Sequence, residues 1–87
     1  MEKIVLEIPE EILISLKETT EEFSRDILML TAVKLYQMGK LSSGRASQLA
    51  GIPRVSFLQS LARYRVPIFD LTAEELQRDF EKIAGED

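Results

Sequence analysis

The sequence predicts a mainly α-helical domain, with a short N-terminal strand followed by about five helices that include a helix-turn-helix. Three features of the chain lead to this prediction. Apolar residues recur at helical spacing over most of its length. A threonine precedes a glutamate by three residues at Thr19 and at Thr72, which is a signal for the start of a helix. The tripeptide Gly-Ile-Pro at 51–53 separates two short helical patterns.

A chain of 87 residues is expected to form a single domain with a small core, which buries only about 60 to 65% of the unfolded surface. A second subunit would add buried area, so we expect a homodimer. Within the domain 1–87, we assign residues 1–38 to the core and the dimer contact, and residues 39–65 to the helix-turn-helix. Residues 66–87 form an extended segment and an acidic helix, which together are a candidate arm for binding a partner.

The composition excludes most familiar catalytic and metal sites. The chain contains no cysteine and no histidine, so it cannot form a disulfide, a thiolate nucleophile, a Ser-His-Asp triad or an ordinary zinc site. The adjacent glutamates at 21–22 and at 74–75 would point about 100° apart on a helix and would not converge on one substrate. We therefore expect no enzyme activity, no metal and no cofactor.

The chain also lacks the signals of a membrane protein or a secreted protein. No apolar run approaches the roughly 18 residues of a membrane span. The N-terminus has no apolar core of the kind that a signal peptide requires. We expect a cytoplasmic protein without membrane contact.

Charge is divided unevenly along the chain. The net charge is −4, but residues 1–26 and residues 70–87 each carry −5, whereas residues 27–69 carry +6 and contain no Asp or Glu. Such an asymmetry favours a site for a polyanion in the centre of the chain. The alternative is an ordinary solvated surface with an uneven distribution of charge.

Residues 3–8 alternate between two faces, which is typical of a short strand. Ile4, Leu6 and Ile8 share one face, and the other face contains Glu7, a poor group to place against phosphates. A strand in an otherwise helical chain needs a second strand to match its backbone hydrogen bonds. We therefore predict that Ile4, Leu6 and Ile8 form the dimer contact by pairing with the same strand of a second subunit.

The strand is followed by a short helix and a long one. Pro9 suits the first position of a helix, and the acidic residues after it favour the helix dipole, so the first helix is predicted to run to about Thr19. A capping box of Thr19 and Glu22 opens a long helix over 20–38, which Gly39 ends. The apolar side chains on the predicted core face of this helix are Phe23, Ile27 and Leu30.

Residues 43–50 and 53–64 are predicted to form two short helices with a tight turn between them. Gly51 can adopt the positive φ that the turn requires, and Pro53 sets the first φ of the second helix. The apolar residues that share the inner face of the second helix are Phe57, Leu61 and Tyr64. This pattern favours a helix-turn-helix over the alternative, a plain helical hairpin.

The outer face of the second helix is small, polar and basic. Gln59 has the groups to pair with adenine, and Arg54 has those to bind guanine or a phosphate. The predicted outer face consists of Val55, Ser56, Gln59, Ala62 and Arg63, with Arg54 at its N-terminal end, and Val55 or Ala62 could contact a thymine methyl group. The residues predicted to hold the phosphates are Lys40, Arg45, Arg63 and Arg65. The expected partner is double-stranded DNA.

The end of the chain is predicted to be extended and then helical. The residue before Pro67 is pushed out of the helical conformation, so residues 65–71 are predicted to be extended. Thr72 and Glu75 form a second candidate capping box, which opens a last helix that ends at about Ala84.

Nearly the whole chain resembles a small prokaryotic family that is catalogued as an uncharacterised protein family. The resemblance rests on the segments IPEEI, LTAVKLYQMGKLSSGRASQLAGIPRVSFLQSLARYRVPIFD and TAEELQRDFEKI. The family pattern AxxLYxxGxxSxGxAaxLAGxxxxxFLxxL is matched here by Ala32, Leu35, Tyr36, Gly39, Ser42, Gly44, Ala46, Leu49, Ala50, Gly51, Phe57, Leu58 and Leu61. The segment GIPRVSF is also similar to the recognition turn of Fis-type bacterial regulators.

The resemblance implies a DNA-binding protein with a helix-turn-helix, of an antitoxin-like kind that is associated with PIN-domain nuclease toxins. It also implies that residues 66–84 extend onto such a toxin. The expected contact residues are Pro67, Ile68, Phe69, Leu71, Arg78, Phe80 and Ile83. The alternative is that the apolar residues among them close the core of their own subunit.

Two functions are compatible with these features. We expect a sequence-specific DNA-binding transcriptional regulator of the antitoxin-like kind, in which helix 53–64 of each subunit of a homodimer enters the major groove. The alternative is a protein-interaction adaptor or toxin-neutralising partner without enzyme activity, in which the helix-turn-helix is degenerate.

Overall fold

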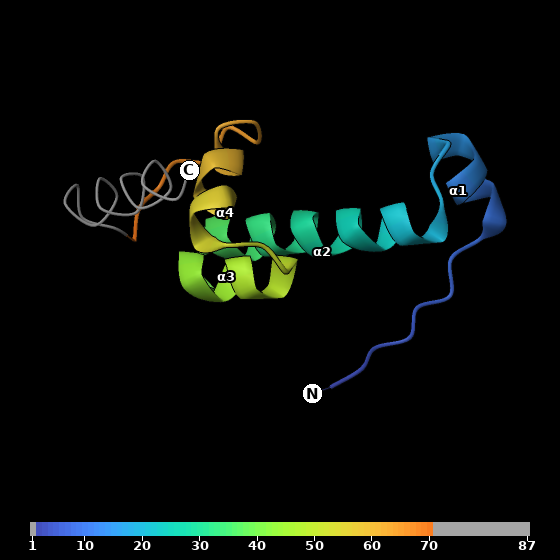
Figure 1. Ribbon diagram of the computed structural model, residues 1–87, viewed down its shortest axis with the longest axis horizontal. Helices are drawn as coiled ribbons and strands as arrows, with labels where there is room; N and C mark the ends of the chain where they lie inside the picture. Colours follow the sequence, from blue (N-terminus) through green and yellow to red (C-terminus); the bar gives the residue numbers. More distant parts are fainter. Residues whose placement is uncertain (1, 71–87) are drawn as a thin grey trace, which may run out of the picture.

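The computed structural model describes residues 2–70, and these residues form four α-helices and no strand (Figure 1). The helices are α1 (Glu10–Leu16), α2 (Thr20–Gln37), α3 (Ser43–Ala50) and α4 (Arg54–Leu61). In Figure 1, α3 and α4 lie at one end of the long helix α2, and α1 lies at the other end. The predicted last helix, which begins after Thr72, lies outside the described residues.

The mainly α-helical class is confirmed, but the predicted N-terminal strand is wrong, and so is the architecture of one strand with about five helices. Residues 2–9 have no regular secondary structure and are all exposed. Ile4 is 84% exposed and Val5 is 89% exposed, so neither face of the segment is covered. Alternation along a sequence does not make a strand unless a second strand matches its backbone hydrogen bonds, and residues 2–70 contain no second strand.

Helix α1 is shorter than predicted. Pro9 stands at its N-cap rather than at its first helical position, and the helix ends at Leu16 instead of near Thr19. Lys17 then adopts the left-handed conformation, with φ of 56°. The Glu18 N–H donates to the Leu13 carbonyl oxygen at 3.1 Å, which closes the end of the helix.

The predicted capping box at the start of α2 is confirmed. The Glu22 N–H donates to Thr19 Oγ1, and the Thr19 N–H donates to Glu22 Oε1, each at 3.1 Å. The helix runs to Gln37, and the chain then reverses at Gly39, which has a φ of 75°. Local signals in the sequence therefore define both ends of this helix.

Only the C-terminal half of α2 contributes buried side chains. The predicted core face is largely uncovered, since Phe23 and Ile27 are half-buried and Leu30 is 53% exposed. The reason is that α3 and α4 pack against the last turns of α2 and leave its first turns open (Figure 1). Helical spacing identifies the apolar face correctly, but it does not indicate how far along the helix that face is covered.

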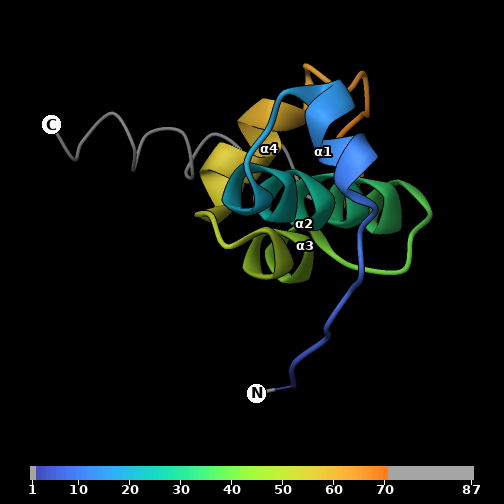
Figure 2. The same ribbon diagram turned by 90° about the vertical axis from the view of Figure 1, so that its right-hand side faces the viewer.

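The core lies where α2, α3 and α4 meet. Figure 2 views this junction with α2 seen end-on. Its buried residues are Ala32, Val33, Tyr36, Ala46, Phe57, Leu58, Leu61 and Val66. The rings of Tyr36 and Phe57 meet edge to face, with their centroids 5.8 Å apart. Ala46 has no exposed surface, so its small side chain allows α3 to pack closely in the core.

We predict that Leu61→Ala lowers the free energy of unfolding by about 3 kcal/mol, because it removes a large side chain from a small core and leaves a cavity. Leu61 is only 1% exposed. The matched control is Gln59→Ala, an exposed position in the same helix, which should change stability by less than about 0.5 kcal/mol. Urea denaturation followed by circular dichroism measures both. Equal losses in the two variants would contradict this description of the core.

Candidate nucleic-acid interface

The turn between α3 and α4 has the conformation that its sequence predicts. Gly51 adopts φ of 72°, and no atom lies within 4 Å of the position a Cβ would take, so the backbone conformation rather than space favours glycine. The Ile52 N–H donates to the Ser47 carbonyl oxygen at 3.2 Å, which ends α3, and Pro53 stands at the N-cap of α4. Figure 1 shows α4 rising steeply from the line of α3 rather than lying antiparallel to it.

Helix α4 ends at Leu61 and is shorter than the predicted helix 53–64. Residues 62–65 continue as turns, and Arg65 adopts the left-handed conformation, with φ of 56°. The Val66 N–H then donates to the Leu61 carbonyl oxygen at 3.1 Å. The predicted inward position of Tyr64 is wrong, because helical spacing no longer applies beyond Leu61, and Tyr64 is 38% exposed.

The outer face of α4 lies outside the core. Gln59 and Arg63 are exposed, and Val55 and Ser56 are half-buried. The buried residues of α4 are instead Phe57, Leu58, Ser60 and Leu61. The side chain of Gln59 is therefore accessible to a ligand that approaches the outer face, and Arg63 is exposed in the turns that follow α4.

Arg54 has a partner inside the domain. Its Nε–H donates to Ser43 Oγ at 3.1 Å, Ser43 is fully buried, and Arg54 itself is half-buried. This hydrogen bond joins the first residue of α4 to the first residue of α3. Part of the hydrogen-bonding capacity of Arg54 is thus used to hold the two helices together.

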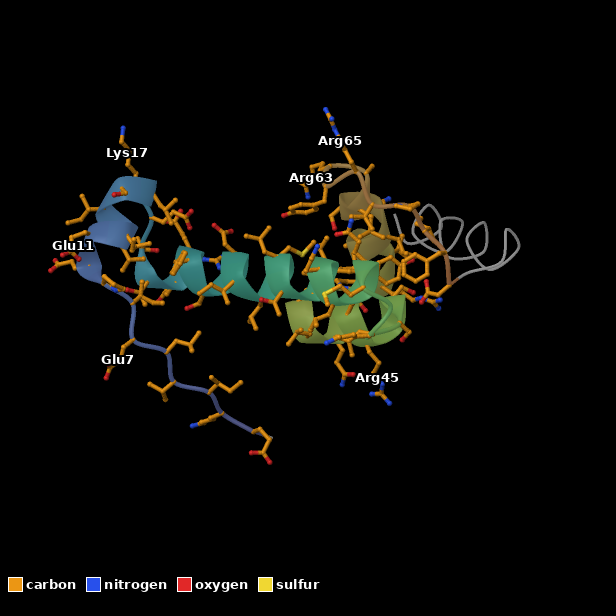
Figure 3. All side chains as sticks on the ribbon, turned by 180° about the vertical axis from the view of Figure 1, so that it is seen from behind. Glu7, Glu11, Lys17, Arg45, Arg63 and Arg65 are labelled. Carbon is orange, nitrogen blue, oxygen red and sulfur yellow. The ribbon has the colours of Figure 1, made fainter. Side chains whose placement is uncertain are left out.

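The basic residues predicted to hold phosphates are all exposed: Lys40, Arg45, Arg63 and Arg65. Figure 3 shows Arg63 and Arg65 pointing to one side of the molecule and Arg45 pointing to the opposite side. Arg45 also donates from Nη1 to Gln48 Oε1 at 3.0 Å, on the surface of α3. The structure therefore distributes these charges around the α3–α4 end rather than gathering them in one cluster.

A hydrogen-bonded cluster joins the segment after α4 to α2 and α3. Asp70 Oδ1 accepts from the Tyr36 hydroxyl at 3.0 Å, and Asp70 Oδ2 accepts from the Ser43 N–H at 2.6 Å. The Tyr36 hydroxyl accepts from the Phe69 N–H at 2.9 Å, and the rings of Tyr36 and Phe69 stack with centroids 4.3 Å apart. We call Tyr36, Ser43, Phe69 and Asp70 the Asp70 cluster.

Sequence reasoning misses the Asp70 cluster, although the chain contains a signal for it. Asp70 is the first acidic residue after Asp26. The amide of Ser43, at the start of α3, has no partner within its own helix, and a helix N-terminus favours a negative charge. A lone carboxylate that follows an acid-free block is therefore a candidate acceptor for such an amide.

Burial and hydrogen bonding act in opposite directions on Asp70. Burial by itself would raise the pKa of the Asp70 carboxyl, but the hydrogen bonds from Ser43 and Tyr36 outweigh burial and lower that pKa. Burial raises the pKa of the Tyr36 hydroxyl, and the hydrogen bond that Tyr36 donates to Asp70 also raises it. Near neutral pH the cluster therefore consists of a charged Asp70 and a neutral Tyr36.

The predicted partner-binding residues within 66–70 divide into two kinds. Ile68 packs against the core, as the alternative interpretation expects. Pro67 is exposed, and Phe69 is 53% exposed although it stacks on Tyr36. The remaining predicted contacts lie outside the described residues: Leu71, Arg78, Phe80 and Ile83.

The residues predicted to form a dimer contact do not belong to the core. Ile4 is 84% exposed, Leu6 is 59% exposed and Ile8 is 36% exposed. They lie in the segment that precedes α1. Their apolar surface is therefore uncovered in a single chain.

Three acidic side chains come together near the start of α2. A hydrogen bond that the protonated Glu18 carboxyl donates to Asp26 raises the pKa of Glu18, and the neighbouring charges of Asp26 and Glu22 act in the same direction. Glu22 is itself used in the capping box. Within residues 2–70, no set of acidic side chains is grouped to bind a metal ion, and no helix has the length and apolar content to cross a bilayer.

We predict that the contribution of Asp70 to stability is lost as the pH falls below about 4. Because the pKa of Asp70 is lower in the folded state, its ionised form stabilises the fold above the unfolded-state pKa, and protonation removes this effect. Asp70→Asn should lower the free energy of unfolding by about 1 kcal/mol at pH 7, since Asp70 is partly exposed.

Urea denaturation between pH 3 and pH 7 measures this difference. The gap between wild type and Asp70→Asn should shrink as the pH falls, whereas the control Glu11→Gln, at an exposed position of α1, should stay close to wild type throughout. A gap that does not change with pH would mean that the charge of Asp70 contributes nothing.

Comparison with known proteins places the chain in a family. The profile of the uncharacterised protein family UPF0175 matches residues 1–85. A UPF0175 protein of Aeropyrum pernix is 34% identical over 79 residues, which cover 91% of this chain and 83% of that protein. A UPF0175 protein of Archaeoglobus fulgidus is 41% identical over 59 residues, which cover 67% of this chain and 64% of that protein.

No solved structure matches the chain. The predicted resemblance to an uncharacterised prokaryotic family is confirmed by the match to the family profile and by these two archaeal relatives. The chain therefore belongs to the uncharacterised protein family UPF0175.

Proposed function

We propose that this protein is a sequence-specific DNA-binding transcriptional regulator, in which α4 enters the major groove of double-stranded DNA. One observation carries the proposal: α3 and α4 are joined through the left-handed Gly51, and α4 turns a polar outer face away from the core. Two short helices that cross around a tight turn are the arrangement of a helix-turn-helix, whose second helix reads bases.

The side chains on this outer face suit base recognition. Gln59 is exposed and could form two hydrogen bonds with adenine, and Arg63 is exposed near the end of α4. Val55 and Ser56 are half-buried and offer a small apolar group and a hydroxyl to a base edge. We assign the reading of sequence chiefly to Gln59.

The distribution of charge supports an approach of DNA to the α3–α4 end. Residues 27–69 contain six basic residues and no acidic residue. In Figure 3, Glu7 and Glu11 lie at the α1 end of the molecule, and Arg45, Arg63 and Arg65 lie at the other end. A phosphate backbone would therefore be attracted to one end and repelled by the other.

We predict that Gln59→Ala reduces the preference for the bound sequence by about 10-fold, because each good base contact contributes about 1 to 3 kcal/mol. Arg45→Ala should instead weaken binding to all sequences alike, since a phosphate contact carries no sequence information. If the protein makes about six phosphate contacts, the logarithm of affinity should fall with the logarithm of salt concentration at a slope of about −5.

The measurement is fluorescence anisotropy with a duplex selected from a random library and with a scrambled duplex. The matched control is Gln37→Ala, an exposed glutamine of α2, which should leave the preference unchanged. Failure of the selection to enrich any sequence, or binding that does not depend on salt, would overturn the proposal.

A homodimer is part of the proposal, because a two-fold protein reads two half-sites about one helical turn apart. None of residues 2–31 is buried, although this part includes many apolar side chains. Helix α1 has only seven residues and no buried side chain, and a helix so short is marginal without packing. We propose that a second copy covers this surface by side-chain packing, without strand pairing.

We predict that Ile14→Asp weakens self-association by at least about 30-fold, because it places a charge on this apolar surface. Ile14 is 68% exposed, so the substitution costs little in a monomer. The control is Met38→Asp, which is 53% exposed beyond the other end of α2. Sedimentation equilibrium at micromolar concentrations measures both, and a monomeric wild type, or equal effects of the two substitutions, would refute the proposed contact.

We extend the proposal to an antitoxin-like role, with a PIN-domain nuclease as the partner of the C-terminal part of the chain. Its support is the resemblance described above, together with the exposed Pro67 and Phe69. A second candidate function, a protein-interaction adaptor, is favoured by the uncovered apolar side chains of residues 2–31. Absence of DNA binding together with co-purification of a nuclease would favour the adaptor.

A further inference from the structure

A series of hydrogen bonds connects the first turn of α4 to Asp70, which follows α4 in the sequence. Arg54, the first residue of α4, donates from Nε to Ser43 Oγ at 3.1 Å. Ser43, the first residue of α3, donates its backbone N–H to Asp70 Oδ2 at 2.6 Å. Asp70 is held in turn by the Tyr36 hydroxyl, which donates to its other carboxylate oxygen at 3.0 Å.

Ser43 is the junction of this series. It is fully buried, so neither its hydroxyl nor its amide can exchange its protein partner for water without moving the helix end. The charge of Asp70 strengthens the hydrogen bond from the Ser43 amide, and the charge of Arg54 strengthens the hydrogen bond to the Ser43 hydroxyl. Asp70, which follows α4, and Arg54, which begins α4, therefore both form charge-assisted hydrogen bonds with Ser43.

The segment that carries Asp70 is attached to the domain through the side chains of Val66, Ile68 and Phe69 as well as through Asp70 itself. Val66 is buried, Ile68 packs on the core, and Phe69 stacks on Tyr36 while remaining 53% exposed. A partner that bound Phe69 and moved it away from Tyr36 would also displace Asp70, because the two residues are adjacent and both form a hydrogen bond with the Tyr36 hydroxyl.

We propose that Asp70 is a positioning residue for α4: through Ser43 it fixes Arg54 and the first turn of α4 in the orientation that reads DNA. This inference rests on the proposed function. It means that a partner which binds Phe69 and displaces Asp70 changes DNA binding without touching α4. By linkage, DNA bound to α4 changes the affinity for that partner by the same factor.

The first test observes the arginine side chains of the ¹⁵N-labelled full chain by NMR. In Asp70→Asn, the Arg54 Nε–H signal should shift, and its exchange with water should accelerate at least about fivefold as the hydrogen bond to Ser43 loosens. The signals of Arg45, Arg63 and Arg65 should not move, and Ser43→Ala identifies the affected signal by removing its acceptor. An unchanged Arg54 signal in Asp70→Asn would overturn the inference.

The second test compares affinities for the selected duplex and for the scrambled duplex at one salt concentration. Asp70→Asn should weaken binding to the selected duplex by about 5- to 20-fold and binding to the scrambled duplex by less than about twofold. The control is Val33→Ala, which shortens a buried core side chain of α2 and destabilises the fold without changing the Asp70 cluster, the outer face of α4 or the proposed dimer surface. It should leave both affinities unchanged.

The outcomes separate the inference from the function on which it rests. If the wild type binds the selected duplex, and Asp70→Asn affects both duplexes alike or behaves like Val33→Ala, the positioning role alone would be overturned. Wild-type protein that binds neither duplex would overturn the proposed function and the DNA-reading part of the inference. In that case the Arg54 signal still decides whether Asp70 positions the first turn of α4.

Discussion

Tyr36 connects three parts of the chain that are far apart in the sequence. Its ring meets Phe57 of α4 edge to face and stacks on Phe69, and its hydroxyl bonds to both the Phe69 amide and the Asp70 carboxylate. Tyr36 and Phe57 are both fully buried, and the contacts of Tyr36 with Phe69 and Asp70 are partly buried at the edge of the core. The arrangement of α4 and of the segment after it against α2 therefore depends on this one side chain more than on any local signal.

The two halves of the described chain differ in how they are stabilised. Every buried residue lies at position 32 or beyond, and the core that they form is small. The N-terminal half holds its helices by local devices, namely the left-handed Lys17 and the Thr19–Glu22 capping box. Local capping contacts define where a helix ends but bury little apolar surface. The stability of the N-terminal half would therefore increase most if the proposed second copy covered it.

Sequence reasoning succeeds here where the determinants are local. The capping box, the α3 bounds and the Gly51 turn are predicted because each depends on residues within a few positions of one another. The strand at 3–8 is predicted wrongly, the extent to which the apolar face of α2 is covered is not predicted, and the Asp70 cluster is missed. Each of these depends on whether another part of the chain covers the residues or bonds to them. For the candidate site, the sequence predicts the accessible Gln59, but not that Arg54 is engaged by Ser43.

Arg65 combines a left-handed backbone conformation with an exposed side chain. A residue with a Cβ in this conformation costs about 1 kcal/mol relative to a relaxed geometry, and glycine would avoid that cost. The chain nevertheless carries an arginine there, and its guanidinium projects into solvent (Figure 3). Glycine at this position would therefore relax the backbone and at the same time remove an exposed positive charge from the turn that follows α4.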